Sequence, residues 1–315
     1  MTRPDDSTLD GDDLRAVEEQ AQGLLDRADA WDRFPVPVDD ILSAANVRVT
    51  PTGAFDPATI VSYLGGKAAV AGARIKSAIG KVFGLYDAKE AVIHIDNTVV
   101  DAKQTFLKLH EAGHHEIPTH RKLFRFFQDC NKTLSPEVAD QFEREANNFA
   151  RFLLFKGPTF AEHAADYPLD IKTPITLART FGSSVYAAAR EFARTNPRAC
   201  VVFALEPIEN DQGSGFRAPV RRIEPSPAFV AQFGRPTVEA VTPDHLLWPV
   251  IPIHRRMTKA VPLAVTDCNG QRHECLAEAI DTTYNILILL YPITALTTTM
   301  VPMPTSANFT RRIQT

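Results

Sequence analysis

The stretch "LKLHEAGHHEIP", Leu107–Pro118, places two histidines four residues apart, with a glutamate directly after the first. On an α-helix, residues at this spacing lie about 6 Å apart along the axis and nearly in line. Leu109 and Gly113 recur with His110 and His114 at helical spacing, so the two imidazoles share the predicted buried face. The stretch therefore predicts a helix that carries two neighbouring histidines into the protein interior.

Two imidazoles in this arrangement can bind one zinc ion at about 2.0–2.1 Å each. The carboxylate of Glu111 points about 100° further round the helix and can reach the open position of such a metal. There it can take a proton from a water molecule that the metal activates and pass it to a leaving amine. We therefore predict His110 and His114 as metal ligands and Glu111 as the catalytic general base. The alternative is a chance pair of core histidines, but unpaired imidazoles on an apolar face would be costly.

A catalytic zinc site has three protein ligands and a water molecule, so a third ligand is expected. His115 points away from the pair and His120 lies beyond a proline, which makes both poor choices. A second predicted helix, "FEREANNFARFLLF", offers Glu143 and Glu145. Glu143 shares a face with small alanines that would let this helix pack closely against Gly113. Glu145 lies about 160° away round the helix, as a solvated charge or behind the ligands. Glu143 is the preferred third ligand.

Composition is that of an ordinary soluble globular protein. The chain has 315 residues, of which 44% are hydrophobic and 23% charged, and its formal net charge of −4 gives no general argument for nucleic-acid binding. Four scattered cysteines and the lack of a signal-peptide pattern at the N-terminus favour a cytoplasmic location. The most apolar run, "YNILILLYPITAL", is too short to span a bilayer and predicts a buried strand, so no membrane association is expected.

The order of patterns along the chain predicts an α+β fold. Residues 1–12 are predicted to be a disordered tail, 13–196 a first domain and 197–315 a smaller, β-rich domain. In the first domain, "KVFGLYD" and "AVIHID" predict a β-hairpin, and residues 173–195 a helix-turn-helix-like pair. The β-rich runs of the second domain are "ACVVFALEP", "RAPVRRIEP", "HLLWPVIPI", "VPLAV" and "YNILILLYPI". The run "CNGQRHEC" favours a hairpin turn over a metal or redox site.

These motifs together resemble the ImmA/IrrE family of metallopeptidases over roughly Arg15 to Thr195. The resemblance rests on "AVIHID" followed by "QTFLKLHEAGHHEIP", then "FEREANNFARFLLF", then "LARTFGSSVYAAARE". It implies a zincin-like fold for the first domain, with His110, His114 and Glu143 as zinc or manganese ligands and Glu111 as general base. It also implies a cytoplasmic, gluzincin-like endopeptidase that cleaves a protein regulator, such as a helix-turn-helix repressor.

Two other functions remain open from the sequence. In one, the metallopeptidase fold is the scaffold of a transcriptional regulator, and the second helix of the pair at 173–195 contacts DNA through Arg190 and Arg194. Two arginines among small apolar residues are few for groove binding, and packing beneath the metal site is preferred. In the other, the protein binds a partner without cutting it. Tyr186 and His163 are of the right type to stabilise an oxyanion, but the sequence does not place either beside the metal.

Overall fold

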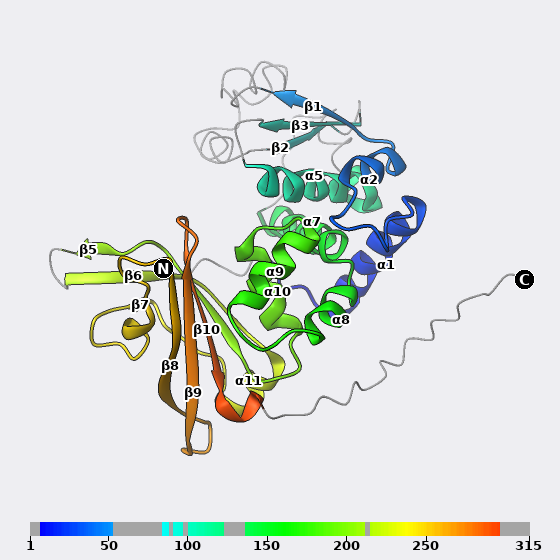
Figure 1. The fold of residues 1–315 in the computed structure, drawn as a ribbon. Coiled ribbons are helices and arrows are strands. Elements are labelled where there is room, and N and C mark those ends of the chain that lie inside the picture. Colours follow the sequence, from blue (N-terminus) through cyan, green and yellow to red (C-terminus); the bar gives the residue numbers. More distant parts are fainter. Residues whose placement is uncertain are drawn as a thin grey trace, which may run out of the picture.

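The structure is a computed structural model that describes residues 7–52, 84–87, 91–96, 100–122, 136–211 and 215–296. The fold is α+β, as predicted, with helices and a small sheet in the first part of the chain and a larger, curled sheet in the second (Figure 1). The helices of the first part are α1 (Gly11–Arg27), α2 (Val38–Ala44), α5 (Asp101–Glu116), α7 (Pro136–Phe155), α8 (Thr159–Ala165), α9 (Lys172–Phe181) and α10 (Val185–Thr195). None of the helices in the described ranges combines the length and hydrophobicity that a bilayer-spanning segment needs.

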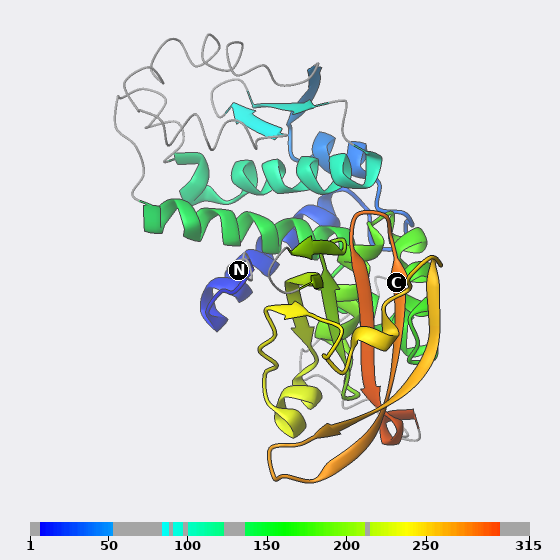
Figure 2. The same ribbon diagram turned by 90° about the vertical axis from the view of Figure 1, so that its left-hand side faces the viewer.

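A three-stranded sheet covers one side of α5. It consists of β1 (Arg48–Thr52), β2 (Gly84–Asp87) and β3 (Val92–Asp96), in the order β1-β3-β2. Strands β2 and β3 are antiparallel, which confirms the predicted hairpin over the described residues, and β1 runs parallel to β3. Figure 2 shows α7 lying along the opposite side of α5, so that α5 is enclosed between sheet and helix.

Helices α5 and α7 approach closely at a glycine. A methyl group on Gly113 would lie 3.3 Å from Cα of Ala146 and 3.1 Å from a ring carbon of Phe149. Both distances are tighter than ordinary van der Waals contact, so the helices can come this near only because position 113 has no side chain. The close packing predicted from the small residues of the two helices is therefore confirmed.

The larger sheet is antiparallel throughout. Its strands are β4 (Val201–Leu205), β5 (Glu209–Asp211), β6 (Gly215–Pro225), β7 (Ala240–Val241), β8 (Met257–Thr266), β9 (Arg272–Asp281) and β10 (Ile286–Pro292), in the order β5-β6-β4-β10-β9-β8 with β7 paired to β6. Every residue of β10 is buried, which confirms the predicted buried strand. Gly270 turns the chain between β8 and β9 with a φ of 82°, so "CNGQRHEC" forms the predicted hairpin.

One predicted strand is wrong. The run "HLLWPVIPI" forms the short 3₁₀ helix η2 (Trp248–Val250) rather than a strand. Pro249 and Pro252 lack the N–H group that a strand must donate, and this outweighs the hydrophobicity of the run. The remaining short elements are α11 (Pro227–Phe233) and η3 (Ile293–Leu296).

Both faces of the central strands β4 and β10 of the larger sheet are buried. On one face, Val202, Leu287 and Leu289 join the same hydrophobic core as α1, α7, α9 and α10. On the other face, Phe203 and Ile288 belong to a second core with residues of α11 and η2. Because the first core crosses from helices to strands, the predicted division of the chain near residue 196 marks a change of secondary structure; that it separates two domains stays a prediction.

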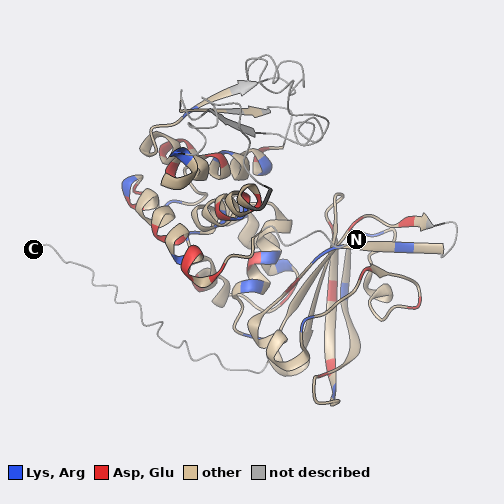
Figure 3. Ribbon diagram, turned by 180° about the vertical axis from the view of Figure 1, so that it is seen from behind, with Lys and Arg blue, Asp and Glu red and all other residues tan. Residues whose placement is uncertain are grey.

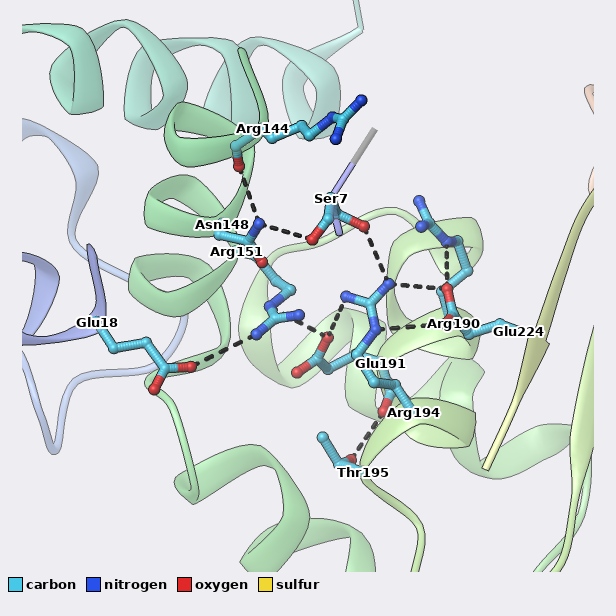
Figure 4. Close-up of polar contacts among 10 residues, drawn as sticks. All are labelled: Ser7, Glu18, Arg144, Asn148, Arg151, Arg190, Glu191, Arg194, Thr195 and Glu224. Atoms are coloured by element: carbon cyan, nitrogen blue, oxygen red, sulfur yellow. Dashed lines mark hydrogen bonds and ion pairs between the residues drawn. The ribbon is translucent and has the colours of Figure 1, made fainter. Parts of the chain in front are cut away.

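Charged side chains join α7 to the sheet through α10 (Figure 4). Arg151 of α7 lies 3.7 Å from Glu18 of α1 and 3.8 Å from Glu191 of α10. Arg194 of α10 lies 3.6 Å from Glu191 and 2.8 Å from Glu224 of β6. These side chains are mostly buried, so their charges compensate one another away from water. We refer to these five residues and Arg190 as the ionic network.

Described structure begins earlier in the chain than the predicted disordered tail allows. Residues 1–6 lie outside the described residues, whereas residues 7–12 are ordered, so the prediction is wrong for them. The side chain of Asp10 caps α1 by accepting hydrogen bonds from the backbone of Asp12 and Asp13. Ser7 accepts a hydrogen bond from the side-chain amide of Asn148 through its carbonyl oxygen, at 2.8 Å. The Asp10 cap and the contact between Ser7 and Asn148 of α7 therefore hold residues 7–12 in place, although their polar composition predicted disorder.

We expect Gly113→Ala to destabilise the protein and Gly23→Ala to stabilise it. Both changes gain about 0.5–1 kcal/mol of helix propensity. At Gly23 the new methyl group would meet only the flexible end of Arg27, at 3.8 Å. At Gly113 it would press on backbone and ring atoms, and such overpacking costs about 1–3 kcal/mol. Urea unfolding of both variants measures the difference; equal stabilities would contradict the packing assigned to α5 and α7.

We expect Glu224→Gln to lower the free energy of unfolding by about 2–3 kcal/mol, because removing one partner of a largely buried pair leaves the other charges uncompensated. The control is Glu209→Gln, which breaks the ion pair between Glu209 of β5 and Arg217 of β6. Those side chains are 49% and 41% exposed, so the control should change stability by less than about 1 kcal/mol. A similar small loss in both variants would show that the ionic network adds little to stability.

Candidate metal centre

Two buried histidines on α5 direct the same ring nitrogen toward one point. The Nε2 atoms of His110 and His114 lie 3.2 Å apart, and the two side chains are only 10% and 5% exposed. Their spacing of four residues places both on the face of α5 that packs against α7. The helix alone therefore supplies two nitrogen donors at one place.

The third member of the cluster comes from α7. Oε2 of Glu143 lies 3.3 Å from Nε2 of His110, and its Oε1 lies 3.6 Å from Nε2 of His114. The Glu143 side chain is 59% exposed, so the cluster is open to solvent on this side. The structure thus brings together the three residues predicted as ligands, with one donor atom of each within 4.8 Å of the others.

The spacing of these donors suits a small divalent metal ion. Two atoms that each bind a tetrahedral zinc at about 2.0–2.1 Å lie about 3.3–3.4 Å from one another. The two Nε2 atoms, 3.2 Å apart, and the pair of His110 Nε2 and Glu143 Oε2, 3.3 Å apart, agree with this value. His114 Nε2 lies 3.6 Å from the other carboxylate oxygen, Oε1. Two imidazoles and a carboxylate are also a donor set that zinc and manganese accept. The residues fit a metal ion, and their role as ligands stays a prediction.

Electrostatics favour the charge states that metal binding needs. The pKa of His114 is lowered to about 4, mainly by burial and also by the neighbouring rings of His110 and His120, against the raising effect of Glu143. Burial tends to raise the pKa of Glu143, but hydrogen bonds from both imidazoles hold it well below its usual range. At neutral pH the cluster therefore offers an ionised carboxylate and a neutral His114.

The other nitrogen of each imidazole also has a partner. Nδ1 of His110 lies 3.1 Å from Oδ1 of Asn147, one turn beyond Glu143 on α7. Nδ1 of His114 lies 3.1 Å from Nδ1 of His120. Partners of this kind fix the orientation and tautomer of a metal-binding imidazole. Asn147 follows Glu143 by four residues and therefore lies on the same face of α7.

His120 was missed because of Pro118. The proline was expected to end the helix and to leave His120 away from the site. Instead, α5 ends at Glu116 and helical structure resumes at Pro118, with the N–H of Arg121 donating to the carbonyl of Ile117 at 3.1 Å. Proline is well suited to the first turn of a helix. The new turn carries His120 back against α5, where it is fully buried. The signal in the sequence was a histidine two residues into a helix that proline begins.

Glu111 is buried on α5, with 8% of its surface exposed. Burial tends to lower the pKa of His110, but a hydrogen bond to Glu143 and the charge of Glu111 raise it above its usual value. The Glu111 carboxylate is therefore close enough to act on the electrostatics of the cluster. Its role as general base stays a prediction.

The two proposed oxyanion stabilisers have other neighbours. The ring of Tyr186 lies 5.6 Å from the guanidinium carbon of Arg190. His163 packs against the rings of Phe34 and Phe181, with centroid distances of 4.9 and 5.5 Å. These contacts belong to the packing of α8, α9 and α10 rather than to the His110–Glu143 cluster. Neither residue gains support as an oxyanion stabiliser.

Comparison with known proteins adds a family and a fold. Residues 72–192 match the family model Peptidase_M78, described as the IrrE N-terminal-like domain. Among solved structures, a Mycobacterium tuberculosis transcriptional regulator is similar, with a TM-score of 0.52 and 12% identity. The similarity covers 89% of this chain and 77% of that protein, and at this identity it shows a shared fold alone. No curated protein matches the chain significantly.

The matched residues include α5 with His110 and His114 and the part of α7 that carries Glu143. The family model and the histidine motif at Leu107–Pro118 therefore lie in the same region of the chain. Residues 72–192 therefore form an IrrE N-terminal-like domain of the Peptidase_M78 metallopeptidase family, the family that the sequence motifs resemble.

Proposed function

We propose that this protein is a zinc-dependent endopeptidase that cleaves a protein regulator, with manganese as the alternative metal. The observation that carries the proposal is the convergence of His110, His114 and Glu143 at metal-binding distances in a member of a metallopeptidase family. A cluster with two buried imidazoles and one exposed carboxylate holds a cation firmly and leaves access for a substrate.

A bound divalent ion would polarise the scissile carbonyl and lower the pKa of the attacking water. The chain supplies the proton transfers. Glu111 takes a proton from the attacking water and returns it to the nitrogen of the leaving amine. His110 and His114 would hold the ion through their Nε2 atoms, while Asn147 and His120 contact the rings at Nδ1 and hold them in place.

The proposed substrate is a helix-turn-helix repressor, in line with the resemblance to ImmA/IrrE proteins. A regulatory role also agrees with the fold shared with a protein described as a transcriptional regulator. A cytoplasmic location is proposed with it. The cysteines within the described residues, Cys200, Cys268 and Cys275, are free thiols, as a reducing compartment would keep them.

The alternative of direct DNA binding through the α9–α10 pair is less well supported. Arg190 and Arg194, the arginines that would contact DNA, both lie within hydrogen-bonding distance of Glu224. In Figure 3, basic and acidic segments are interspersed over the described helices and strands rather than gathered on one basic face. A DNA-binding surface needs cations that are available to phosphates. Partner binding without cleavage remains the second candidate, and the experiments below separate it from turnover.

We expect the purified protein to bind about one zinc ion per chain, and Glu143→Ala to lose or greatly weaken this binding. The matched control is Asp140→Ala, which removes another carboxylate from α7 at a side chain that is 72% exposed. Elemental analysis after reconstitution with zinc or manganese measures both. Metal-free wild-type protein, or equal loss in the two variants, would contradict a metal site at Glu143.

We expect Glu111→Gln to keep the metal and to lose peptide cleavage by a factor of about 10²–10⁴, the usual contribution of a general base. The assay is cleavage of a candidate helix-turn-helix repressor co-expressed with each form of the protein. Unchanged cleavage would remove Glu111 from the mechanism. A wild-type protein that loads with zinc and binds the repressor but leaves it intact would favour the partner-binding function.

A further inference from the structure

We propose that His120, held by Glu145, is a positioning residue that fixes the tautomer and orientation of His114 for metal binding. The inference rests on the proposed metal site and adds a function for two residues outside the ligand set. It follows from a continuous line of short contacts. His114 Nδ1 lies 3.1 Å from His120 Nδ1, and His120 Nε2 lies 2.7 Å from Oε2 of Glu145.

Proton positions along this line are determined by the ligand role of His114. A neutral His114 that gives its Nε2 lone pair to a metal carries its proton on Nδ1. That proton faces Nδ1 of His120, which must then accept it and be unprotonated. His120 consequently carries its own proton on Nε2, where the Glu145 carboxylate accepts it. Every donor in the line meets an acceptor, so one arrangement satisfies all three residues.

Burial, a stacked ring and a fixed carboxylate hold His120 in place. It is fully buried, and its ring stacks on Phe142 with a centroid distance of 3.9 Å and an interplanar angle of 22°. The second oxygen of Glu145 accepts a hydrogen bond of 2.9 Å from Gln141, which also donates to Asp13 of α1 at 2.8 Å. The carboxylate that orients His120 is therefore itself fixed between α7 and α1.

The two metal-facing imidazoles differ in what supports them. His110 donates to the neutral side-chain amide of Asn147, whereas His114 is connected through His120 to a carboxylate. An ionised acceptor at the end of the line makes each hydrogen bond stronger and the His114 nitrogen a better electron donor. Loss of this kind of support lowers metal affinity by a factor of about 10–100.

The experiment compares zinc affinity, measured by chelator competition, in wild type, His120→Phe and His120→Gln. Phenylalanine keeps a ring to stack on Phe142 but has no polar atoms, so we expect affinity to fall by about 10–100-fold. Glutamine offers an oxygen to accept from His114 and an NH₂ group to donate to Glu145, and it should recover most of the loss. His163→Phe makes the same chemical change in aromatic surroundings elsewhere and should leave affinity unchanged.

A second measurement does not depend on substitution at a fully buried site. Nitrogen NMR of the zinc-loaded wild type should show His114 protonated on Nδ1 and His120 protonated on Nε2. In addition, Glu145→Gln keeps an acceptor oxygen but removes the charge, so affinity should fall by less than in His120→Phe. Circular dichroism and thermal melting of the metal-free variants establish whether each one folds. If His120→Phe does not fold, the NMR spectrum of the zinc-loaded wild type and the zinc affinity of Glu145→Gln test the positioning role instead.

The outcomes separate this inference from the proposed function. Zinc binding by wild type with unchanged affinity in both His120→Phe and Glu145→Gln would overturn the positioning role and leave the metal site intact. A proton on Nδ1 of His120 in the zinc-loaded protein would also overturn it. A wild-type chain that binds no zinc would overturn the proposed function and the inference with it. Weaker binding in His120→Phe with rescue by glutamine supports the positioning role.

Discussion

The close approach of α5 and α7 is the constraint on which the site depends. Packed helices usually lie about 8–10 Å apart, and small residues at the contact allow the lower end of this range. A methyl group at Gly113 would lie 3.3 Å from Cα of Ala146, so the two helices are closer than a larger residue at this position would allow. Because His110 is on one helix and Glu143 on the other, this separation sets their distance. A glutamate has limited reach, and a wider interface would move its oxygens away from both imidazoles.

Different faces of helix α7 carry residues with different contacts. Glu143 and Asn147 are four residues apart and share the face toward α5, where both reach His110. Glu145 points in another direction and reaches the short helical turn that carries His120. Further along, Arg151 connects the helix to α1 and α10. A single helix therefore positions the predicted ligand Glu143, the partners of both imidazoles and the link toward the larger sheet.

Local patterns in the sequence were enough for most of the elements and for selecting three residues that the structure brings together. Helical periodicity placed His110 and His114 on one buried face, and the small residues of both helices indicated the contact at Gly113. Periodicity also separated Glu143 from Glu145, because two residues apart on a helix means nearly opposite directions. The fold class followed from the change of pattern after residue 196, and the hairpin at "CNGQRHEC" from its Asn-Gly turn.

Features that depend on contacts between distant segments could not be obtained in this way. Glu145, the partner of His120, lies 25 residues further along the chain, and neither local pattern predicts that the two residues meet. A proline such as Pro118 can either end one helix or begin the next, and only the tertiary structure determines which of the two occurs. The run around Pro249 shows the opposite error, in which hydrophobicity indicated a strand that the backbone could not form.

The α9–α10 pair illustrates how shape and charge can point to different functions. Its two helices and the turn at Gly182 have the outline of a DNA-reading motif, and Arg190 and Arg194 lie on its second helix. Both arginines nevertheless contact Glu224 of β6, and Glu224 is only 15% exposed. Moving Arg194 to a phosphate would leave this carboxylate short of a partner in a poorly hydrated place, which is costly. The charges on α10 are therefore arranged for holding the helices to the sheet, and the likeness to a DNA-binding motif is one of backbone shape.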